Sequence, residues 1–320
     1  MKILIVRFSS IGDIVLTTPV IRAVKQQLKN AEVHVLTKQS FATVLEANPY
    51  VDKLYTIKKS IFEITSDLKK ENYDYVIDLH HTLRTLKLKL ALGKKSFSFN
   101  KLNWEKLLMV HFKMNRLPNL HIVDRYFETV ASLGVTNDLK GLDYFIKSND
   151  VVDITKTLPS NFGEQYAVLV VGGSYYTKQI PANKLKEICA TSKIPIVLLG
   201  GKDDATIAEE VYQQFKMTTI NLCGKLSLNQ SASVIQQAKY VVTSDTGLMH
   251  IAAAYKKDVY SLWGNTIPQF GMGAYMAGTN SKILEVANLS CRPCSKLGYK
   301  KCPKGHFKCM NDINVSLINP

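Results

Sequence analysis

The sequence has no apolar run near the roughly 18–20 residues that a helix needs to cross a membrane. Near the N-terminus, the apolar run between Lys2 and Arg7 is too short for a secretory signal peptide. That run is typical of a first β-strand instead. We therefore expect a cytoplasmic protein.

Two nucleotide-binding fingerprints are also missing. The chain has no Gly-x-Gly-x-x-Gly sequence, which weighs against a dehydrogenase and against a nucleotide-sugar epimerase that depends on this fingerprint. It also has no Gly-x-x-x-x-Gly-Lys-Ser/Thr loop, which weighs against a P-loop ATPase. A nucleotide would have to be held by other turns.

Acidic residues are scarce relative to basic ones. There are 26 Asp and Glu against 41 Lys and Arg, so the formal net charge is +15, and this indicates an anionic partner. Between Arg84 and Arg116 the only acid is Glu105, and large apolar residues interrupt the basic ones. This mixture favours an anionic membrane surface over a nucleic acid, for which no motif is present. The alternative is a solvated helix face that packs its apolar side in the core.

Cysteine is too rare for a disulfide scaffold, with six residues in 320, but four of the six lie in the last thirty residues. Their spacing is Cys291-x2-Cys294-x7-Cys302-x6-Cys309, with His306 nearby. Four such ligands suffice for a tetrahedral structural zinc site, and a cytoplasmic location argues against stable disulfides. The alternative is a basic tail with four reduced cysteines.

Apolar strand-like runs alternate with helix-like segments along most of the chain. Examples are the strands expected at 2–7, 33–36 and 75–79 and, after an irregular connection, at 167–171 and 196–199. This alternation predicts an α/β protein with parallel, doubly wound sheets. The rhythm occurs twice, so we expect one domain in residues 1–150 and a second in residues 151–320.

One stretch of the second half predicts a ligand-binding turn. A buried strand at 240–243 is followed by the polar turn Ser244-Asp245-Thr246-Gly247 and a helix at 248–254. Ligands bind at this carboxyl edge of parallel sheets, and the first turn of a helix capped by Asp245 or Thr246 suits a phosphate. His250 would face the same ligand. The alternative is a capped, packed helix with His250 in the core.

Other strand ends supply further candidates. Gly172-Gly173-Ser174 follows a strand and precedes Lys178, which would neutralise a phosphate. In the first half, Asp13 follows Gly12 after the first strand. A carboxylate at that position can accept a proton from an incoming hydroxyl, although it can also cap the next helix.

Two longer stretches resemble the signatures of a known family. Residues 1–19, MKILIVRFSSIGDIVLTTP, are similar to the N-terminus of family 9 glycosyltransferases, the lipopolysaccharide heptosyltransferases. Residues 244–254, SDTGLMHIAAA, resemble their second signature. Shorter landmarks occur in the same order and spacing, namely Asp78-Leu79 with Arg84, residues 121–126 and residues 263–268. The resemblance covers nearly the whole chain.

The resemblance implies a GT-B fold, in which two Rossmann-like domains face a central cleft. The donor would be a nucleotide-activated sugar, typically ADP-heptose. The acceptor would be the inner core of lipopolysaccharide, an anionic glycolipid on the cytoplasmic face of the inner membrane, where the protein would bind peripherally.

The resemblance also implies roles for individual residues. Asp13 would be the general base in a transfer that inverts the anomeric carbon. No metal or other cofactor would be needed, because Lys178 and a helix N-terminus would stabilise the leaving diphosphate. The donor site would contain Ser174, Lys178, Leu226, Asp245, Thr246, Gly247 and His250, and the acceptor site Ser10, Gly12, Arg84, His121 and Arg125.

The chain departs from the family at the donor site. Ile180 stands where the family usually has a tryptophan, and Leu226 where some members place a methionine against the adenine. These departures leave the donor base and sugar open, so a transferase of the same fold with another nucleotide-sugar and glycan acceptor is the first alternative. A basic nucleic-acid-binding protein is the second.

Overall fold

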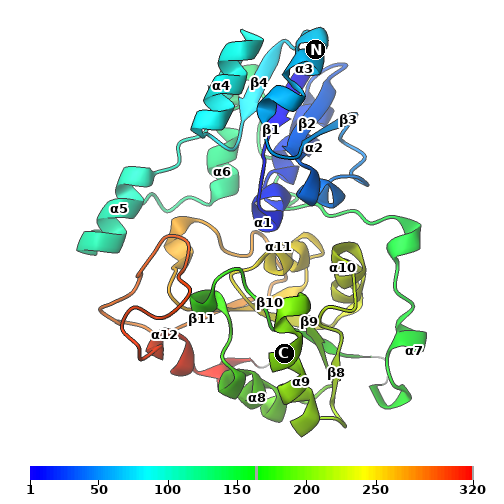
Figure 1. Ribbon diagram of the computed structural model, residues 1–320, viewed down its shortest axis with the longest axis vertical. Helices are drawn as coiled ribbons and strands as arrows, with labels where there is room; N and C mark the ends of the chain where they lie inside the picture. Colours follow the sequence, from blue (N-terminus) through cyan, green and yellow to red (C-terminus); the bar gives the residue numbers. More distant parts are fainter. Residues whose placement is uncertain (163–164, 319–320) are drawn as a thin grey trace. The chain divides into compact units, whose positions relative to one another are not determined.

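The computed structural model describes residues 1–162 and 165–318 (Figure 1). The chain divides into two compact units. The first unit contains residues 1–102 and 120–145, and the second contains residues 103–119 and 146–320. The division lies close to the predicted domain boundary, except that residues 103–119 group with the second unit.

The first unit contains a five-stranded parallel sheet with the order β3-β2-β1-β4-β5. The side chains of β1 from Ile3 to Val6 are buried, as its continuous apolar sequence predicts for a central strand. Its strands are β1 (Lys2–Val6), β2 (Glu32–Lys38), β3 (Lys53–Ile57), β4 (Tyr75–Asp78) and β5 (Lys95–Ser98). Its helices are α1 (Ile11–Val15), α2 (Thr18–Gln27), α3 (Thr65–Lys70), α4 (Leu83–Leu92) and α6 (Ile122–Phe127), and its 3-10 turns are η1 (Gln39–Val44), η2 (Ile61–Glu63) and η3 (Ala131–Leu133).

Several helices of the first unit are shorter than the sequence predicts. Apolar residues at helical spacing predict one helix between Ile14 and Leu28, but the structure has two there, α1 and α2. The same kind of pattern predicts a helix over 122–133, where the structure has α6 followed by η3. Pro19 explains the first difference, because proline lacks an N–H and is tolerated only in the first turn, where it lies in α2.

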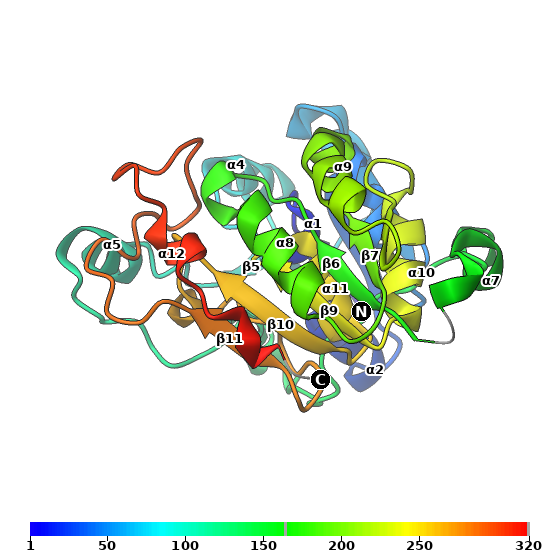
Figure 2. The same ribbon diagram turned by 90° about the horizontal axis from the view of Figure 1, so that it is seen from below.

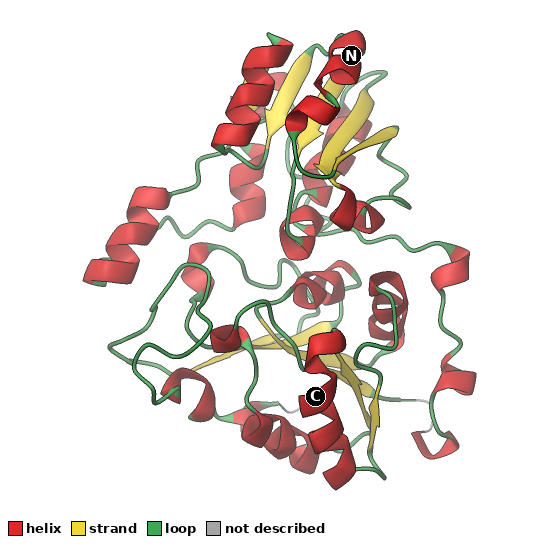
Figure 3. Cartoon of the chain, viewed as in Figure 1, coloured by secondary structure: helices red, strands yellow, loops and turns green. Residues whose placement is uncertain are grey.

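The second unit contains a six-stranded parallel sheet with the order β11-β10-β9-β6-β7-β8. Its strands are β6 (Ala167–Val170), β7 (Ile196–Leu199), β8 (Thr219–Asn221), β9 (Tyr240–Ser244), β10 (Asp258–Trp263) and β11 (Lys282–Glu285). Its helices are α5 (Asn103–Phe112), α7 (Ile154–Thr157), α8 (Ala182–Thr191), α9 (Ala205–Gln214), α10 (Leu228–Gln237), α11 (Gly247–Ala254) and α12 (Lys308–Asn311). Its 3-10 turns are η4 (Ser148–Asp150), η5 (Ser160–Phe162), η6 (Tyr176–Lys178), η7 (Lys202–Asp204), η8 (Pro268–Phe270) and η9 (Val315–Leu317). Figure 3 shows how strands and helices alternate within each unit.

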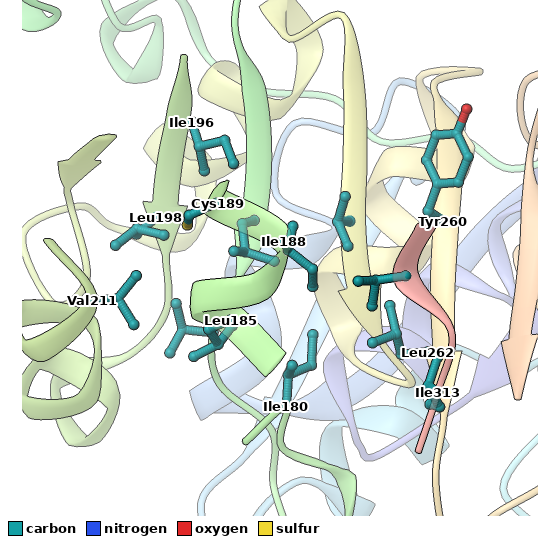
Figure 4. Packing of buried hydrophobic residues seen from close by; sticks show 14 of the residues in the cluster. Ile180, Leu185, Ile188, Cys189, Ile196, Leu198, Val211, Tyr260, Leu262 and Ile313 are labelled. Atoms are coloured by element: carbon teal, nitrogen blue, oxygen red, sulfur yellow. The ribbon is translucent and has the colours of Figure 1, made fainter. Parts of the chain in front are cut away.

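Successive residues of the second sheet pack into two separate apolar layers. Leu169 and Leu198 belong to the layer that α8 and α9 cover (Figures 2 and 4). Their neighbours Val168 and Val197 belong to the layer shared with α10 and α11. Because side chains alternate along a strand, both faces of this sheet are buried, which is the doubly wound arrangement predicted from the sequence.

Candidate active-site residues

The first candidate site lies where the strand order of the first sheet reverses. The chain builds β2 and β3 on one side of β1 and then returns to place β4 on the other side. In open α/β sheets, ligands bind outside the carboxyl ends of the strands at such a reversal. We call the residues that follow β1 and β4 here the Asp13 site: Arg7, Ser10, Asp13 and His80.

The Asp13 carboxylate is held on both oxygens. Its Oδ1 lies 2.6 Å from Nη2 of Arg7, and its Oδ2 accepts hydrogen bonds from the N–H and the hydroxyl of Ser10, at 3.1 and 2.7 Å. Ser10 is the cap residue of α1, so Asp13 bonds back to the cap from the first turn. The alternative prediction that Asp13 itself caps the next helix is therefore wrong: Ser10 is the cap, and Asp13 supports it from within α1. The side chain remains 23% exposed, which leaves the carboxylate accessible.

Arg7 is a buried support for Asp13 that the sequence analysis did not single out. Its Nη1 donates to the carbonyl of Leu79, at 2.5 Å, and to the hydroxyl of Tyr126, at 3.0 Å. Burial opposes its charge, but Asp13, Tyr126 and Asp78 outweigh burial and raise the pKa of Arg7. The guanidinium is therefore a fixed cation that orients the carboxylate and shares its charge.

His80 also belongs to this site and was missed from the sequence. Its ring lies 5.0 Å from that of Phe8, and its Nδ1 is buried with no hydrogen-bond partner among the described residues. Burial, followed by the positive charges of Arg7 and Lys101, lowers the pKa of His80 to about 4. The imidazole is thus neutral near pH 7. The landmark Asp78-Leu79 ends just before it, and that was the available signal.

The residues predicted to bind an acceptor divide into two groups. Ser10 contacts Asp13, and the exposed Arg84 places its guanidinium 5.6 Å from the ring centre of Phe8, next to β1. By contrast, His121 accepts a hydrogen bond from the N–H of Val123 as the cap of α6. Arg125 is only 2% exposed and donates to the carbonyl of Asn100. Gly12 is buried within α1. Each of these three residues thus has a structural contact or a buried place, and acceptor binding by them stays a prediction.

The second candidate site lies at the strand-order reversal of the second sheet, where β6 and β9 are neighbours. We call the residues after these strands and after β10 the Lys178 site: Lys178, Asp245, Thr246 and Thr266. Nζ of Lys178 lies 2.5 Å from Oδ2 of Asp245, although the two residues are 67 positions apart. The hydroxyl of Thr266 donates to the same oxygen, at 3.3 Å. Three loops thus meet at one carboxylate.

The turn before α11 has the predicted capped form. Thr246 is the cap residue, and its hydroxyl accepts a hydrogen bond from the N–H of Met249, at 3.4 Å. The helix that follows has eight residues. Its N-terminus, with the first N–H groups and the positive end of the helix dipole, comes directly after Asp245, the partner of Lys178. The combination of a lysine and a helix N-terminus suits a diphosphate.

The remaining predicted donor residues differ in exposure. Ser174 is exposed on the loop after β6, and Gly247 is half-buried as the first residue of α11. Leu226 is half-buried and packs against the layer of α10 and α11. His250 is 2% exposed inside α11, a buried environment that matches the alternative in which this residue packs in the core.

The four clustered cysteines lie in a segment that we call the cysteine tail, residues 291–310. The Sγ of Cys291 is 3.8 Å from Nε2 of His306. Burial and the charges of the other tail thiols raise the pKa of Cys309 to about 12. Among residues 1–162 and 165–318, however, the only three ligand atoms within 4.8 Å of one another belong to Glu32, His34 and Glu71. The thiols are neighbours but do not form so compact a set.

The two glutamates of this group, Glu32 and Glu71, are already paired with lysine side chains. Nζ of Lys2 lies 2.7 Å from Glu71 and 3.2 Å from Glu32, and Nζ of Lys53 lies 2.6 Å from Glu71. Side-chain hydrogen bonds from these lysines lower the pKa of Glu71. The group is therefore an ion-pair network that ties β1, β2 and β3 to the segment after α3.

Sequence comparison assigns the chain to a family. The sequence pattern described as glycosyltransferase family 9 (heptosyltransferase) matches residues 61–303. The chain belongs to this family. Lipopolysaccharide heptosyltransferase 1 of Campylobacter coli is 26% identical over 295 residues, which cover 83% of this chain and 84% of that protein. Its namesake in Escherichia coli K12 is 27% identical over 310 residues, which cover 88% and 93%.

Solved structures agree with the fold of this family 9 glycosyltransferase. E. coli heptosyltransferase WaaC with ADP matches at a TM-score of 0.66 and 25% identity, covering 88% of this chain and 92% of that one. A family 9 glycosyltransferase from Veillonella parvula matches at a TM-score of 0.74 and 22% identity, covering 89% and 86%. The two doubly wound units are those of the predicted GT-B fold.

Proposed function

We propose that this family 9 glycosyltransferase moves a heptose from ADP-heptose to the inner core of lipopolysaccharide and inverts the anomeric carbon. Relatives at 26% and 27% identity are lipopolysaccharide heptosyltransferases, and WaaC was solved with ADP. The observation that carries the proposal is what stands at each reversal point. In the first sheet it is the accessible carboxylate of Asp13, oriented by Arg7, and in the second it is Lys178, paired with Asp245 beside a helix N-terminus.

In this proposal Asp13 is the general base. It takes the proton of the acceptor hydroxyl while that oxygen forms a bond to the anomeric carbon of the donor. The bond from this carbon to the diphosphate breaks at the same time, and ADP leaves from the opposite face, which inverts the carbon. Arg7 and Ser10 hold the carboxylate in one orientation, so little reorganisation is needed when the proton moves.

Lys178 and the first turn of α11 would stabilise the leaving diphosphate. An ammonium group has three N–H donors, so the bond to Asp245 leaves two for phosphate oxygens. Asp245 and Thr266 then act as positioning residues that set where the ammonium group lies. These groups supply positive charge directly, and we propose that catalysis needs no metal ion. Activity would then persist in excess EDTA.

For the cysteine tail we propose a structural zinc site formed by Cys291, Cys294, Cys302 and Cys309. The Cys-x2-Cys pair and the contact between Cys291 and His306 support it. Binding would require the thiols to draw closer and lose their protons. Metal analysis of untagged protein prepared without chelator should give one zinc per chain, and a value near zero would exclude the site.

For the acceptor we propose contact with an anionic membrane surface. None of the helices in the described residues is long and apolar enough to cross a bilayer. No residue of α5 is buried, and its Trp104 and Phe112 are 68% and 64% exposed, next to Lys106 and Lys113. Aromatic and basic side chains together suit an anionic lipid interface. The protein should sediment with vesicles that contain phosphatidylglycerol and less with neutral vesicles.

The donor is tested by thermal shift with ADP-heptose and with UDP- and GDP-sugars. Stabilisation by ADP-heptose and ADP alone would support the proposed donor, because a ligand that binds only the native state raises Tm. Stabilisation by a UDP- or GDP-sugar alone would favour the same fold with another donor. Incorporation of radiolabelled heptose into a heptose-deficient lipopolysaccharide acceptor would then test the transfer itself.

A further inference from the structure

The cysteine tail contacts two of the three loops that form the Lys178 site. One loop follows β6 and carries Lys178, and the other follows β10 and carries Thr266. All of these contacts lie within the second unit. The tail also packs its last residues, including Phe307, Cys309 and Met310, into the apolar layer under α8.

The tail is bonded to Thr177, the residue before Lys178. Thr177 is 1% exposed. Its N–H donates to the carbonyl of Tyr299, at 3.2 Å, and its hydroxyl accepts from the N–H of Tyr299, at 2.8 Å. The ring of the preceding Tyr176 stacks on that of Phe307, with centres 5.2 Å apart. The short turn η6 therefore lies against the tail at both Tyr176 and Thr177.

Close backbone approach at Gly298 fixes this contact. Its φ is +141°, and a Cβ atom there would lie 2.6 Å from Cβ of Tyr175. That neighbour cannot swing away, because its Cβ is fixed by the backbone. Only glycine allows both the conformation and the approach.

The tail also satisfies three successive carbonyls of the loop after β10. Arg292 donates from Nε to Gly264, at 2.6 Å, and from Nη2 to Thr266, at 3.0 Å. The N–H of Cys294 donates to the carbonyl of Asn265, at 3.0 Å. Thr266 is only 2% exposed, so its backbone depends on protein partners. The tail thereby determines the path of the loop that brings the Thr266 hydroxyl to Asp245.

We propose that the cysteine tail is a positioning element of the donor site. It fixes Lys178 through Thr177, and Thr266 through the carbonyls that Arg292 binds. The expected effect of the tail on donor binding rests on the proposed function. The expected effect of the tail on the position of Lys178 does not. If the tail only stabilised the fold, loosening it would lower Tm and leave Lys178 unchanged.

Amine-reactive labelling followed by mass spectrometry measures the accessibility of Lys178 without any ligand. Thr177→Val removes the hydroxyl that accepts from Tyr299 but keeps the β-branched shape and the backbone. We expect Lys178 to be labelled about tenfold faster in this variant than in the wild type, as for the loss of about 1.4 kcal/mol of local protection. The exposed Lys216 serves as the internal reference, and Thr177→Ser should restore the wild-type rate.

Kinetics provide the second readout. Arg292→Gln should raise KM for ADP-heptose about five- to tenfold with a smaller change in kcat, as the loss of one or two positioning hydrogen bonds predicts. Lys300→Gln removes the same charge from an exposed position of the tail and should match the wild type.

The outcomes separate the two proposals. An unchanged labelling rate of Lys178 in Thr177→Val, with folding confirmed by Tm, would overturn the positioning role. Faster labelling in a protein that does not use ADP-heptose would uphold the positioning role and count against the proposed donor.

Discussion

The two sites occupy equivalent places in their sheets but are built differently. The Asp13 carboxylate is held by Arg7 and Ser10, both within six residues of it in the sequence. The Lys178 site joins residues 67 positions apart and depends on a tail more than a hundred residues further along the chain. The groups that bond directly to Asp13 thus come from one strand end and the next helix, whereas the Lys178 site joins three loops.

This difference suits the two tasks that we propose. Proton transfer needs one carboxylate at a fixed place. The buried Arg7 holds the carboxylate of Asp13 there, so little conformational freedom has to be lost when the acceptor binds. A nucleotide-sugar must enter and leave, so its binding groups lie on loops. The loops of the Lys178 site are then steadied by the tail.

The largest expected effect comes from removing the base. Asp13→Asn keeps the size of the side chain but cannot take a proton, so we expect kcat to fall on the order of 10³-fold. ADP affinity, measured by calorimetry, should stay within about twofold of the wild type, because we propose that the donor binds at the other sheet. Loss of both sugar transfer and ADP binding in Asp13→Asn would contradict the assignment of the base and of donor binding to separate sites.

Lys178→Ala should mainly weaken the binding of the donor. Loss of charge-assisted hydrogen bonds predicts a rise of about 10- to 100-fold in the Kd for ADP-heptose. The single change also leaves Asp245 without its cation, so the double variant Lys178→Ala/Asp245→Asn separates lost attraction from new repulsion. Recovery of part of the affinity in the double variant would show that repulsion contributes. Unchanged donor affinity in Lys178→Ala would contradict the assignment of the second site.

His250→Ala distinguishes a ligand contact from packing in the core. If His250 contacts the donor, Kd for ADP-heptose should rise about tenfold, as expected for one hydrogen bond to a charged group. If it only packs in α11, Tm falls and the affinity of the folded protein is unchanged. A change in kcat alone would contradict both roles.

The last prediction concerns the pH dependence of stability at the Asp13 site. The pKa of His80 is lowered to about 4 in the folded protein, from an ordinary value near 6.5. Between these values the unfolded chain binds a proton that the folded chain does not, so stability falls as pH falls from about 6.5 to 4. His80→Asn should reduce this loss in thermal melts. His111→Asn, which changes an exposed histidine, should leave the wild-type profile unchanged.

The fold was largely predictable because its signals are local. Continuous apolar strands and helical periodicity predicted the two doubly wound sheets, and the turn before α11 limited its cap to Asp245 or Thr246, of which Thr246 is the cap observed. Helix lengths were less predictable, since Pro19 and the 3-10 turns shorten segments whose apolar pattern continues. Residues 103–119 group with the second unit through contacts such as Lys113 with Pro293, which no local pattern encodes.

The sites were predictable in their charged ends but not in their supports. Asp13, Lys178 and Asp245 stand at strand ends, where the pattern directs attention. Arg7 was not predicted because it stands at the end of an apolar strand. His80 was not predicted because its low pKa arises from burial that only the fold creates. The bonds of Arg292 to Gly264 and Thr266 join segments whose relation cannot be read from spacing.

The placement of α5 in the second unit also has a consequence for synthesis. Lys113, just after α5, donates to the carbonyl of Pro293, 180 residues later in the chain. At translation rates of about 5–20 residues per second, Lys113 is synthesised roughly 10 to 40 s before Pro293. The strands of the first sheet are complete by Ser98, before α5 is made. The nascent protein therefore carries an aromatic, basic helix whose following residue, Lys113, lacks its partner until Pro293 is added.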